Sequence, residues 1–222
     1  MAAERGGTEG KVSVDVSPIT GVVLAGGRST RLGRNKALEL VGSVPLVSLA
    51  ISVLESVTSD LVVVVADEAQ ANTLPVPDRG RTVQDLFPDS GALGGIFTGL
   101  TEAHSNWVVV VACDMPFLSK PLLSHMANAR TGFDIVIPVL DGWPEPTHAL
   151  YSKKCLAPME ESIRAGRLKI TGFFGSVAVK YVPQKTVEEI DPGRWSFFNV
   201  NTQRNLEFAR ARAAEIASES LA

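Results

Sequence analysis

At residues 19–36 the chain reads ITGVVLAGGRSTRLGRNK. Its first six residues, Ile19–Leu24, have the length and apolar character of a buried strand, and Gly26-Gly27 marks a tight turn after them. A ligand can approach the backbone N–H groups of such a turn closely. The stretch then places four cations within nine residues, at Arg28, Arg31, Arg34 and Lys36.

Backbone donors beside a group of cations are what a triphosphate requires, so the stretch predicts a triphosphate-binding loop. It is not a P-loop, because the Gly-Lys-Ser/Thr ending is absent, and it does not follow the G-x-G-x-x-G pattern. The alternative is a glycine turn followed by an ordinary solvated basic loop.

Strand-like and helix-like segments alternate outward from this stretch to about residue 130. The apolar runs at 61–66 and 107–112 have the composition of strands that are covered on both faces. Helical spacing of apolar residues occurs at 45–57, and 93–103 can form a helix that is entered through Gly94-Gly95. This alternation predicts a three-layer α/β fold with a mainly parallel central sheet, in which ligands bind beyond the carboxyl ends of the strands.

The rest of the chain is predicted to form one domain with the part already described. Residues 1–16 are small, polar and unpatterned and are predicted to be a disordered tail, whereas 17–222 shows neither a linker nor an internal repeat. Further elements are expected as follows: a short strand at 81–84, a helix capped by Ser119 and running to Ala127, strands at 133–139, 147–151, 177–182 and 197–200, a helix at 153–165 disrupted at Pro158, and a final helix from about Gln203.

Composition excludes several classes of protein. The formal net charge of -3 gives no basic surface for nucleic acid. No apolar run approaches the roughly 20 residues that span a bilayer, and the N-terminus lacks the apolar core of a signal peptide. With only two cysteines, Cys113 and Cys155, a disulfide framework is not expected and the reducing cytoplasm is the expected location.

Asp114 is the strongest single candidate for a functional residue. It follows six consecutive apolar residues, so the strand at 107–112 should carry it to the ligand edge of the sheet. Its carboxylate suits Mg²⁺, which binds one or two carboxylates together with phosphates and water. The alternative is that Asp114 caps the next helix, a position for which Ser119 is better placed. Cys113 is predicted to be a small buried residue and not a nucleophile, because the neighbouring aspartate raises its pKa.

The segment Leu24–Lys36 resembles the nucleotidyltransferase signature L-A-G-G-x-S-x-R-M-G-x-D-K, and most narrowly that of molybdenum cofactor guanylyltransferase and its close relatives. Leu32 replaces the usual Met, which conserves volume, and Asn35 replaces the usual Asp, which removes a carboxylate near Lys36. The resemblance extends over about residues 19–210. It implies a Rossmann-like nucleotidyltransferase fold with a nucleotide-binding part at about 17–130 and an acceptor-binding part at about 131–205.

Two further segments resemble motifs of the nucleotide side of that family. Gln84-Asp85 followed by Gly91–Gly95 is similar to the family's Asp and its later G-P-L-A-G, with Ala92 in place of Pro and Gly94 in place of Ala. In relatives this aspartate contacts the guanosine, although a carboxylate could equally hold ribose hydroxyls. Alternatively, Asp85 belongs to a turn and the glycines serve close packing. The segment Cys113–Pro116 is similar to the family's C/G-D-x-P-F.

Two other segments resemble the acceptor side. Phe198–Thr202 is similar to the family's F-x-N-V/I-N-T-P, and strand alternation would place Asn199 and Asn201 on one face, where one could reach the metal or the acceptor. Asn201 could instead cap the final helix. His148 lies in a segment similar to the family's H-P-x-x-A-L-Y, although a structural histidine explains it equally well.

Three cations, at Arg164, Arg167 and Lys169, could meet the acceptor phosphate or belong to an ordinary solvated helix end.

The resemblance implies the following site. The catalytic residues are Asp114, Lys36 and Arg28. The nucleotide contacts come from Leu24, Ala25, Gly26, Gly27, Arg28, Lys36, Asp85, Gly94 and Asp114. The weaker acceptor contacts come from His148, Asn199 and Asn201, and Mg²⁺ binds Asp114.

The implied reaction is transfer of GMP from GTP to the terminal phosphate of molybdenum-molybdopterin, with release of pyrophosphate. Molybdoenzymes or their chaperones are the implied protein partners, without nucleic acid or membrane. Three alternatives stay open: cytidylyl transfer to the same cofactor, nucleotidyl transfer to a sugar or other small phosphate, and a non-catalytic nucleotide-binding or cofactor-carrier module. Retention of Asp114, Lys36 and the basic loop argues against the last.

Overall fold

The computed structural model describes residues 17–26, 35–75 and 77–219. One large sheet forms the centre, in the strand order β10-β7-β9-β6-β1-β4-β5, with the short β8 paired to β7. Its strands are β1 (Ile19–Leu24), β4 (Asp60–Val65), β5 (Gly80–Gln84), β6 (Trp107–Ala112), β7 (Ile135–Leu140), β8 (Trp143–Pro144), β9 (His148–Ser152) and β10 (Val179–Val182). A separate hairpin consists of β2 (Leu40–Val41) and β3 (Val44–Pro45).

The predicted α/β fold with a mainly parallel sheet is confirmed. Strand β1 is parallel to both β4 and β6, β5 is parallel to β4, and β10 is parallel to β7. The exceptions are β9, which is antiparallel to β6 and β7, and the short β8, which is antiparallel to β7. The short connection from β7 through β8 reverses the chain, whereas a parallel neighbour would require a crossover of a dozen or more residues.

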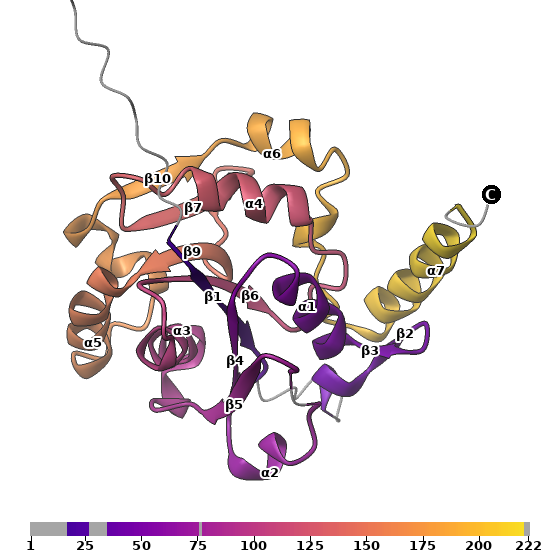
Figure 1. Cartoon of the computed structure of the whole chain (residues 1–222), viewed down its shortest axis with the longest axis horizontal. Helices are drawn as coiled ribbons and strands as arrows, with labels where there is room; N and C mark the ends of the chain where they lie inside the picture. The colour runs from indigo at the N-terminus through magenta and orange to yellow at the C-terminus, as the bar shows by residue number, and fades with distance from the viewer. Residues whose placement is uncertain (1–16, 27–34, 76, 220–222) are drawn as a thin grey trace, which may run out of the picture.

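Helices cover both faces of the sheet, as Figure 1 shows for α3 and α5 on one side and α1 and α4 on the other. The helices are α1 (Leu46–Glu55), α2 (Glu68–Ala71), α3 (Gly91–Glu102), α4 (Lys120–Asn128), α5 (Leu156–Arg164), α6 (Gln184–Ile190) and α7 (Gln203–Glu219). Successive strand residues serve opposite cores: Val23 packs with α1 and α4, and Val22 packs with α3 and α5. Burial on both faces explains why the central strands are apolar at nearly every position.

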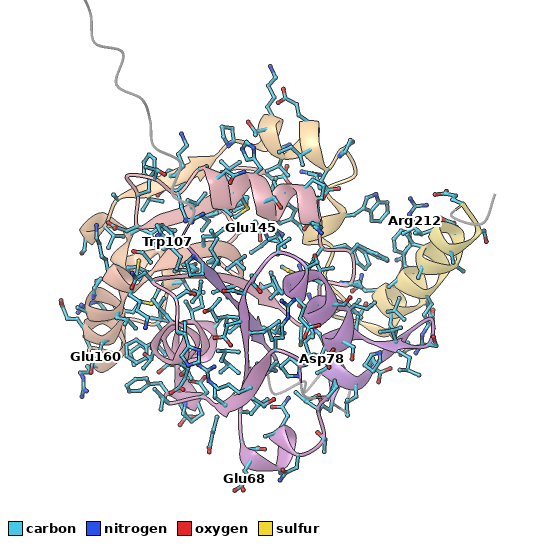
Figure 2. The ribbon with its side chains drawn as sticks, viewed as in Figure 1. Glu68, Asp78, Trp107, Glu145, Glu160 and Arg212 are labelled. Atoms are coloured by element: carbon cyan, nitrogen blue, oxygen red, sulfur yellow. The ribbon has the colours of Figure 1, made fainter. Side chains whose placement is uncertain are left out.

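The C-terminal helix α7 stands out from the sheet beside β2 and β3 (Figure 1). It packs there through a third, small core of buried residues, namely Val41, Leu46, Val200, Leu206 and Ala209. Figure 2 shows Arg212 on the side of α7 turned toward the rest of the molecule, where its guanidinium lies 5.2 Å from the centre of the Trp195 ring. The helix therefore fixes the segment that precedes it, which includes Asn201.

Two expected elements differ from the structure. The predicted strand at 197–200 is wrong: a 3-10 turn at Trp195–Phe197 leads into an extended segment that bonds to the sheet region through Val200 N and Asp114 O, 2.9 Å apart. Its apolar residues pack against α7 instead of pairing in the sheet. The expected disruption at Pro158 is also wrong, because Pro158 lies in the first turn of α5, where a backbone N–H has no helical partner.

The order of the strands creates a topological switch point at β1. From β1 the chain builds β4 and then β5 on one side, and it returns through α3 to build β6 on the other side. Cys113 N donates to Leu24 O at 3.1 Å, so the segments that leave β1 and β6 start side by side. In open parallel sheets, ligands bind outside the carboxyl ends of the strands at such a point.

The contact of α3 with β1 provides a test of this packing. A methyl group on Gly99 would lie 2.4 Å from Val22 Cγ1, so Gly99→Ala forces α3 away from the strand that leads to the switch point. We expect the free energy of unfolding to fall by about 1–3 kcal/mol in urea denaturation. The matched control is Gly172→Ala, where nothing lies within 4 Å of the added methyl group and stability should stay within about 0.5 kcal/mol. Equal stabilities for the two variants would contradict the packing.

Candidate functional site

A cavity of about 930 Å³ lies at the switch point. It is bordered by residues that leave the carboxyl ends of four parallel strands. They are Leu24, Ala25 and Gly26 after β1, Ala66 and Asp67 after β4, Asp85, Pro88, Asp89, Gly91, Ala92 and Gly95 after β5, and Ala112, Cys113 and Asp114 after β6. Asn35, Lys36, Ala37, Val64, Thr147 and Asn201 complete the border. Both its size and its place are those of a ligand pocket.

The turn after β1 is held from the neighbouring strand. Ala25 N donates to Val64 O at 2.8 Å, and Gln70 Nε2 donates to Ala25 O at 2.7 Å. Gln70 Oε1 also accepts from Ala66 N at 3.0 Å, so one amide joins the ends of β1 and β4. A side chain on Gly26 would meet Ala66 N at 3.0 Å, which explains the need for glycine.

Sequence reasoning missed Gln70, although a signal existed. Asp67 caps α2 and accepts from Gln70 N at 2.8 Å, so Asp67 and Gln70 have the spacing of a capping box. The expected contacts of Gly27, Arg28, Arg31 and Arg34 lie outside the described residues.

Three side chains from distant parts of the chain meet in the cavity. Lys36 Nζ lies 2.5 Å from Asp114 Oδ2 and 2.8 Å from Asn201 Oδ1. The side chains of Lys36 and Asp114 are largely buried, with 17% and 13% exposed. Asn35 does not hold the lysine, because its own Oδ1 accepts from Ala37 N at 3.2 Å and caps the 3-10 turn Lys36–Leu38.

Asp114 does not cap α4, which was the alternative role expected for it. Ser119 caps α4 as predicted, with its hydroxyl oxygen 3.3 Å from Leu122 N. The second carboxylate oxygen, Asp114 Oδ1, is buried and has no hydrogen-bond partner among the residues that the structure describes. An unpartnered carboxylate oxygen that borders a cavity is suited to a ligand that brings its own positive charge.

Asp85 takes part in two structural hydrogen bonds and also borders the cavity. Its Oδ1 accepts from Thr98 Oγ1 at 2.8 Å and from Phe87 N at 2.9 Å, which joins the end of β5 to α3. Its side chain still borders the cavity. Of the two glycines at 94 and 95, Gly95 borders the cavity, whereas Gly94 packs against Phe87 O and does not.

Of the expected acceptor residues, Asn201 borders the cavity, whereas Asn199 and His148 do not. Asn201 reaches the cavity, but Asn199 bonds locally, from Nδ2 to Phe197 O at 2.9 Å. His148 is fully buried on β9, with Nε2 2.7 Å from Ser196 Oγ, and its neighbour Thr147 borders the cavity instead. Burial lowers the pKa of His148 to about 4, so the ring is neutral at pH 7.

Two of the three cations expected near the acceptor, Arg164 and Arg167, have local partners at the end of α5. Arg164 pairs with Glu160 at 2.6 Å, and Arg167 pairs with Glu161 at 3.1 Å. Figure 2 shows Glu160 on the outer side of α5, away from the sheet. Lys169 leads into the 3-10 segment Ile170–Ser176 and does not border the cavity.

Two features concern metals and membranes. In the part of the chain that the structure describes, three or more His, Cys, Asp or Glu side chains never gather as a metal cluster. Among the same described residues, no helix combines the length and apolar character needed to cross a membrane.

Sequence comparison identifies the family. Residues 21–174 match the family described as the MobA-like NTP transferase domain. A probable molybdenum cofactor guanylyltransferase of Pelotomaculum thermopropionicum is 37% identical over 194 residues, which cover 87% of this chain and 93% of the relative. A molybdenum cofactor guanylyltransferase of Desulfosudis oleivorans is 33% identical over 198 residues, which cover 87% and 95%.

Solved structures also superpose on this chain. Molybdopterin-guanine dinucleotide biosynthesis protein A from Archaeoglobus fulgidus superposes with a TM-score of 0.77 at 29% identity, covering 89% of this chain and all of the other. A 4-diphosphocytidyl-2C-methyl-D-erythritol synthase from Anaerococcus prevotii has a TM-score of 0.65 at 18% identity, covering 89% of this chain and 96% of the other. At that identity the likeness shows the fold alone.

The two thiols should be unreactive. Burial, followed by the charge of Asp114, raises the pKa of Cys113 to about 12, and burial, followed by Asp134, raises the pKa of Cys155 to about 12. Because a raised pKa suppresses the thiolate below it, only about one thiol in 10⁴ is ionised at pH 8. We expect iodoacetamide to leave both cysteines unmodified in the native protein at pH 8, as measured by mass spectrometry, and to modify both after denaturation. Rapid modification of native Cys113 would show that the thiol is exposed and activated.

Proposed function

Because the chain belongs to the MobA-like NTP transferase family, we propose that it transfers GMP from GTP to the terminal phosphate of molybdenum-molybdopterin and releases pyrophosphate. One observation carries the proposal: the glycine turn after β1, Lys36 and Asp114 border one cavity at the switch point of the sheet. The names of the relatives supply the base and the acceptor, which the geometry accommodates.

The nucleotide is assigned to the β1, β4 and β5 side of the cavity. The backbone of Leu24, Ala25 and Gly26 lies along the proposed path of the triphosphate, with Gly27 and Arg28 following in the sequence. Lys36 supplies an ammonium to the phosphates. Asp85 Oδ1 is engaged by Thr98 and Phe87, so Oδ2 is the oxygen assigned to guanine N–H donors or to ribose hydroxyls.

The residues present fit a magnesium ion at Asp114. Mg²⁺ is commonly held by one or two carboxylates plus substrate phosphates and water, so a single protein carboxylate suffices when the triphosphate is bound. This fit is supported by Asp114 Oδ1, which is buried and has no hydrogen-bond partner within the described ranges 17–26, 35–75 and 77–219. When bound, Mg²⁺ would neutralise charge on the phosphate oxygens.

The chain itself contributes positioning and electrostatics. The fixed turn after β1 aligns the triphosphate, and the Lys36 ammonium offsets the negative charge that grows on the phosphates during in-line attack at the α-phosphorus. The attacking phosphate of the acceptor is already ionised at neutral pH, so no side chain needs to remove a proton. The leaving pyrophosphate carries the electron pair of the broken P–O bond.

The acceptor is assigned to the opposite side of the cavity. Thr147 borders it next to β9, and Asn201 borders it from the segment before α7. His148 follows Thr147 in the sequence and bonds to Ser196, so we assign it a supporting role on this side of the cavity without contact with the acceptor. We place the reaction in the cytoplasm, in keeping with two free and buried cysteines, and we expect apo-molybdoenzymes or their chaperones to receive the product.

The choice of nucleotide tests the function directly. We expect GTP to bind at least about tenfold more tightly than ATP, CTP or UTP, a difference of about 1.4 kcal/mol, because Asp85 offers acceptors to the donors of guanine. Calorimetry with each nucleotide measures the affinities, and pyrophosphate release with Mg²⁺ and molybdopterin measures the reaction. If CTP is preferred in both assays, the protein is a cytidylyltransferase for the same cofactor.

Substitution of Asp114 tests the chemistry. Asp114→Asn keeps the shape of the side chain but removes the charge, so turnover should fall by about 10²–10³, as for the loss of a major electrostatic stabiliser. Thermal unfolding should change little, because the backbone bond from Val200 N to Asp114 O is retained. The control is Asp89→Asn, which changes another carboxylate at the border of the cavity and should affect turnover far less. A folded Asp114→Asn variant with near-normal Mg²⁺-dependent turnover would refute the mechanism.

A further inference from the structure

The side chain of Asn201 does not point at free space in the cavity but bonds to a lysine. Its Oδ1 accepts from Lys36 Nζ at 2.8 Å, and the same ammonium donates to Asp114 Oδ2 at 2.5 Å. The three residues are brought together by the loop after β1, the end of β6 and the approach to α7. Neither fold topology nor motif spacing requires this contact, so it calls for an explanation of its own.

Asn201 is held independently of the lysine. On one side, Val200 is fully buried in the small core under α7, and Val200 N donates to Asp114 O at 2.9 Å. On the other side, Thr202 and Asn205 form a reciprocal cap: Thr202 N donates to Asn205 Oδ1 and Asn205 N donates to Thr202 Oγ1, both at 3.1 Å. This cap replaces the one that Asn201 could have supplied, so the Asn201 amide remains available to Lys36.

The geometry divides the donors of the ammonium. A lysine ammonium has three N–H groups, and two of them are used by Asp114 and Asn201. The third remains for a phosphate. The Lys36 ammonium lies 2.5 Å from Asp114 Oδ2. It therefore occupies one of the two carboxylate oxygens that a divalent cation would need.

We propose that Asn201 is a positioning residue that keeps Lys36 on Asp114 while the nucleotide site is empty, so that a divalent cation gains full access to Asp114 only together with the nucleotide. The phosphates of the nucleotide then draw the ammonium away, and the freed carboxylate meets the metal that they bring. This inference rests on the proposed roles of Lys36 and Asp114, but it does not depend on which base or acceptor is used.

The test measures Mn²⁺ binding to the nucleotide-free protein. The electron paramagnetic resonance signal of free Mn²⁺ reports how much metal stays unbound. Removal of one of its two partners makes the lysine easier to displace, so Asn201→Ala should tighten Mn²⁺ binding by about ten- to a hundredfold, the effect expected for one hydrogen bond to a charged group. The substitution changes no charge, so general electrostatics cannot produce the increase. Lys36→Met, which removes the competing cation, should tighten Mn²⁺ binding at least as much.

Gln203→Ala is the matched control, because among the described residues this exposed amide bonds only to Glu207 on its own helix, so the change should leave Mn²⁺ affinity unchanged. Thermal unfolding confirms that each variant is folded. Unchanged Mn²⁺ affinity in folded Asn201→Ala would overturn the proposal, and weaker binding would overturn it by making Asn201 a direct metal ligand. Since the assay contains neither GTP nor acceptor, tighter binding would support the proposal even if GMP transfer were not observed.

Discussion

The parallel pairing of β1 with both β4 and β6 is the constraint on which the site depends. It fixes the register on both sides of β1: Leu24 pairs with Val64 of β4 on one side and with Ala112 of β6 on the other. The chain therefore leaves β1 and β6 at the same edge of the sheet, where Cys113 N bonds to Leu24 O. Every group assigned to chemistry is placed relative to this edge, and a shift of one residue in β6 would turn Asp114 to the other face.

The fold could be predicted from the sequence because its signals are local and repeated. Runs such as 19–24 and 107–112 are apolar at nearly every position, and both form strands with the predicted boundaries. Elements that depend on tertiary contacts were missed or misassigned. The segment at 197–200 has the composition of a strand but buries Val200 against a helix, and the short helix α2 is too brief to show periodicity.

The site could be predicted only in part, because a motif specifies which residue is present but not which atom meets which partner. Asp114, Lys36 and the turn at Ala25, which the sequence motifs single out, all border the cavity. The sequence could not distinguish Gly94 from Gly95, since the choice depends on which of them packs under Phe87. Nor could it show that His148 is fully buried against Ser196, or that Gln70, which lies outside the recognised motifs, joins the ends of two strands. These contacts join positions that are distant in the chain, and composition carries no record of them.

The division of the cavity explains how one fold can serve different nucleotidyl transfers. The phosphate and metal groups are proposed to lie where β1 and β6 leave the sheet, at positions that the central strand pairing fixes. The base is proposed to lie toward β4 and β5, among residues such as Asp67 and Ala92 that belong to connecting segments. Connecting segments can change without altering the register of the core. A cytidylyl-named enzyme at 18% identity shares the fold, so the fold alone does not select the base. We therefore propose that selection comes from the side chains after β4 and β5, among which Asp85 is held by Thr98 of α3.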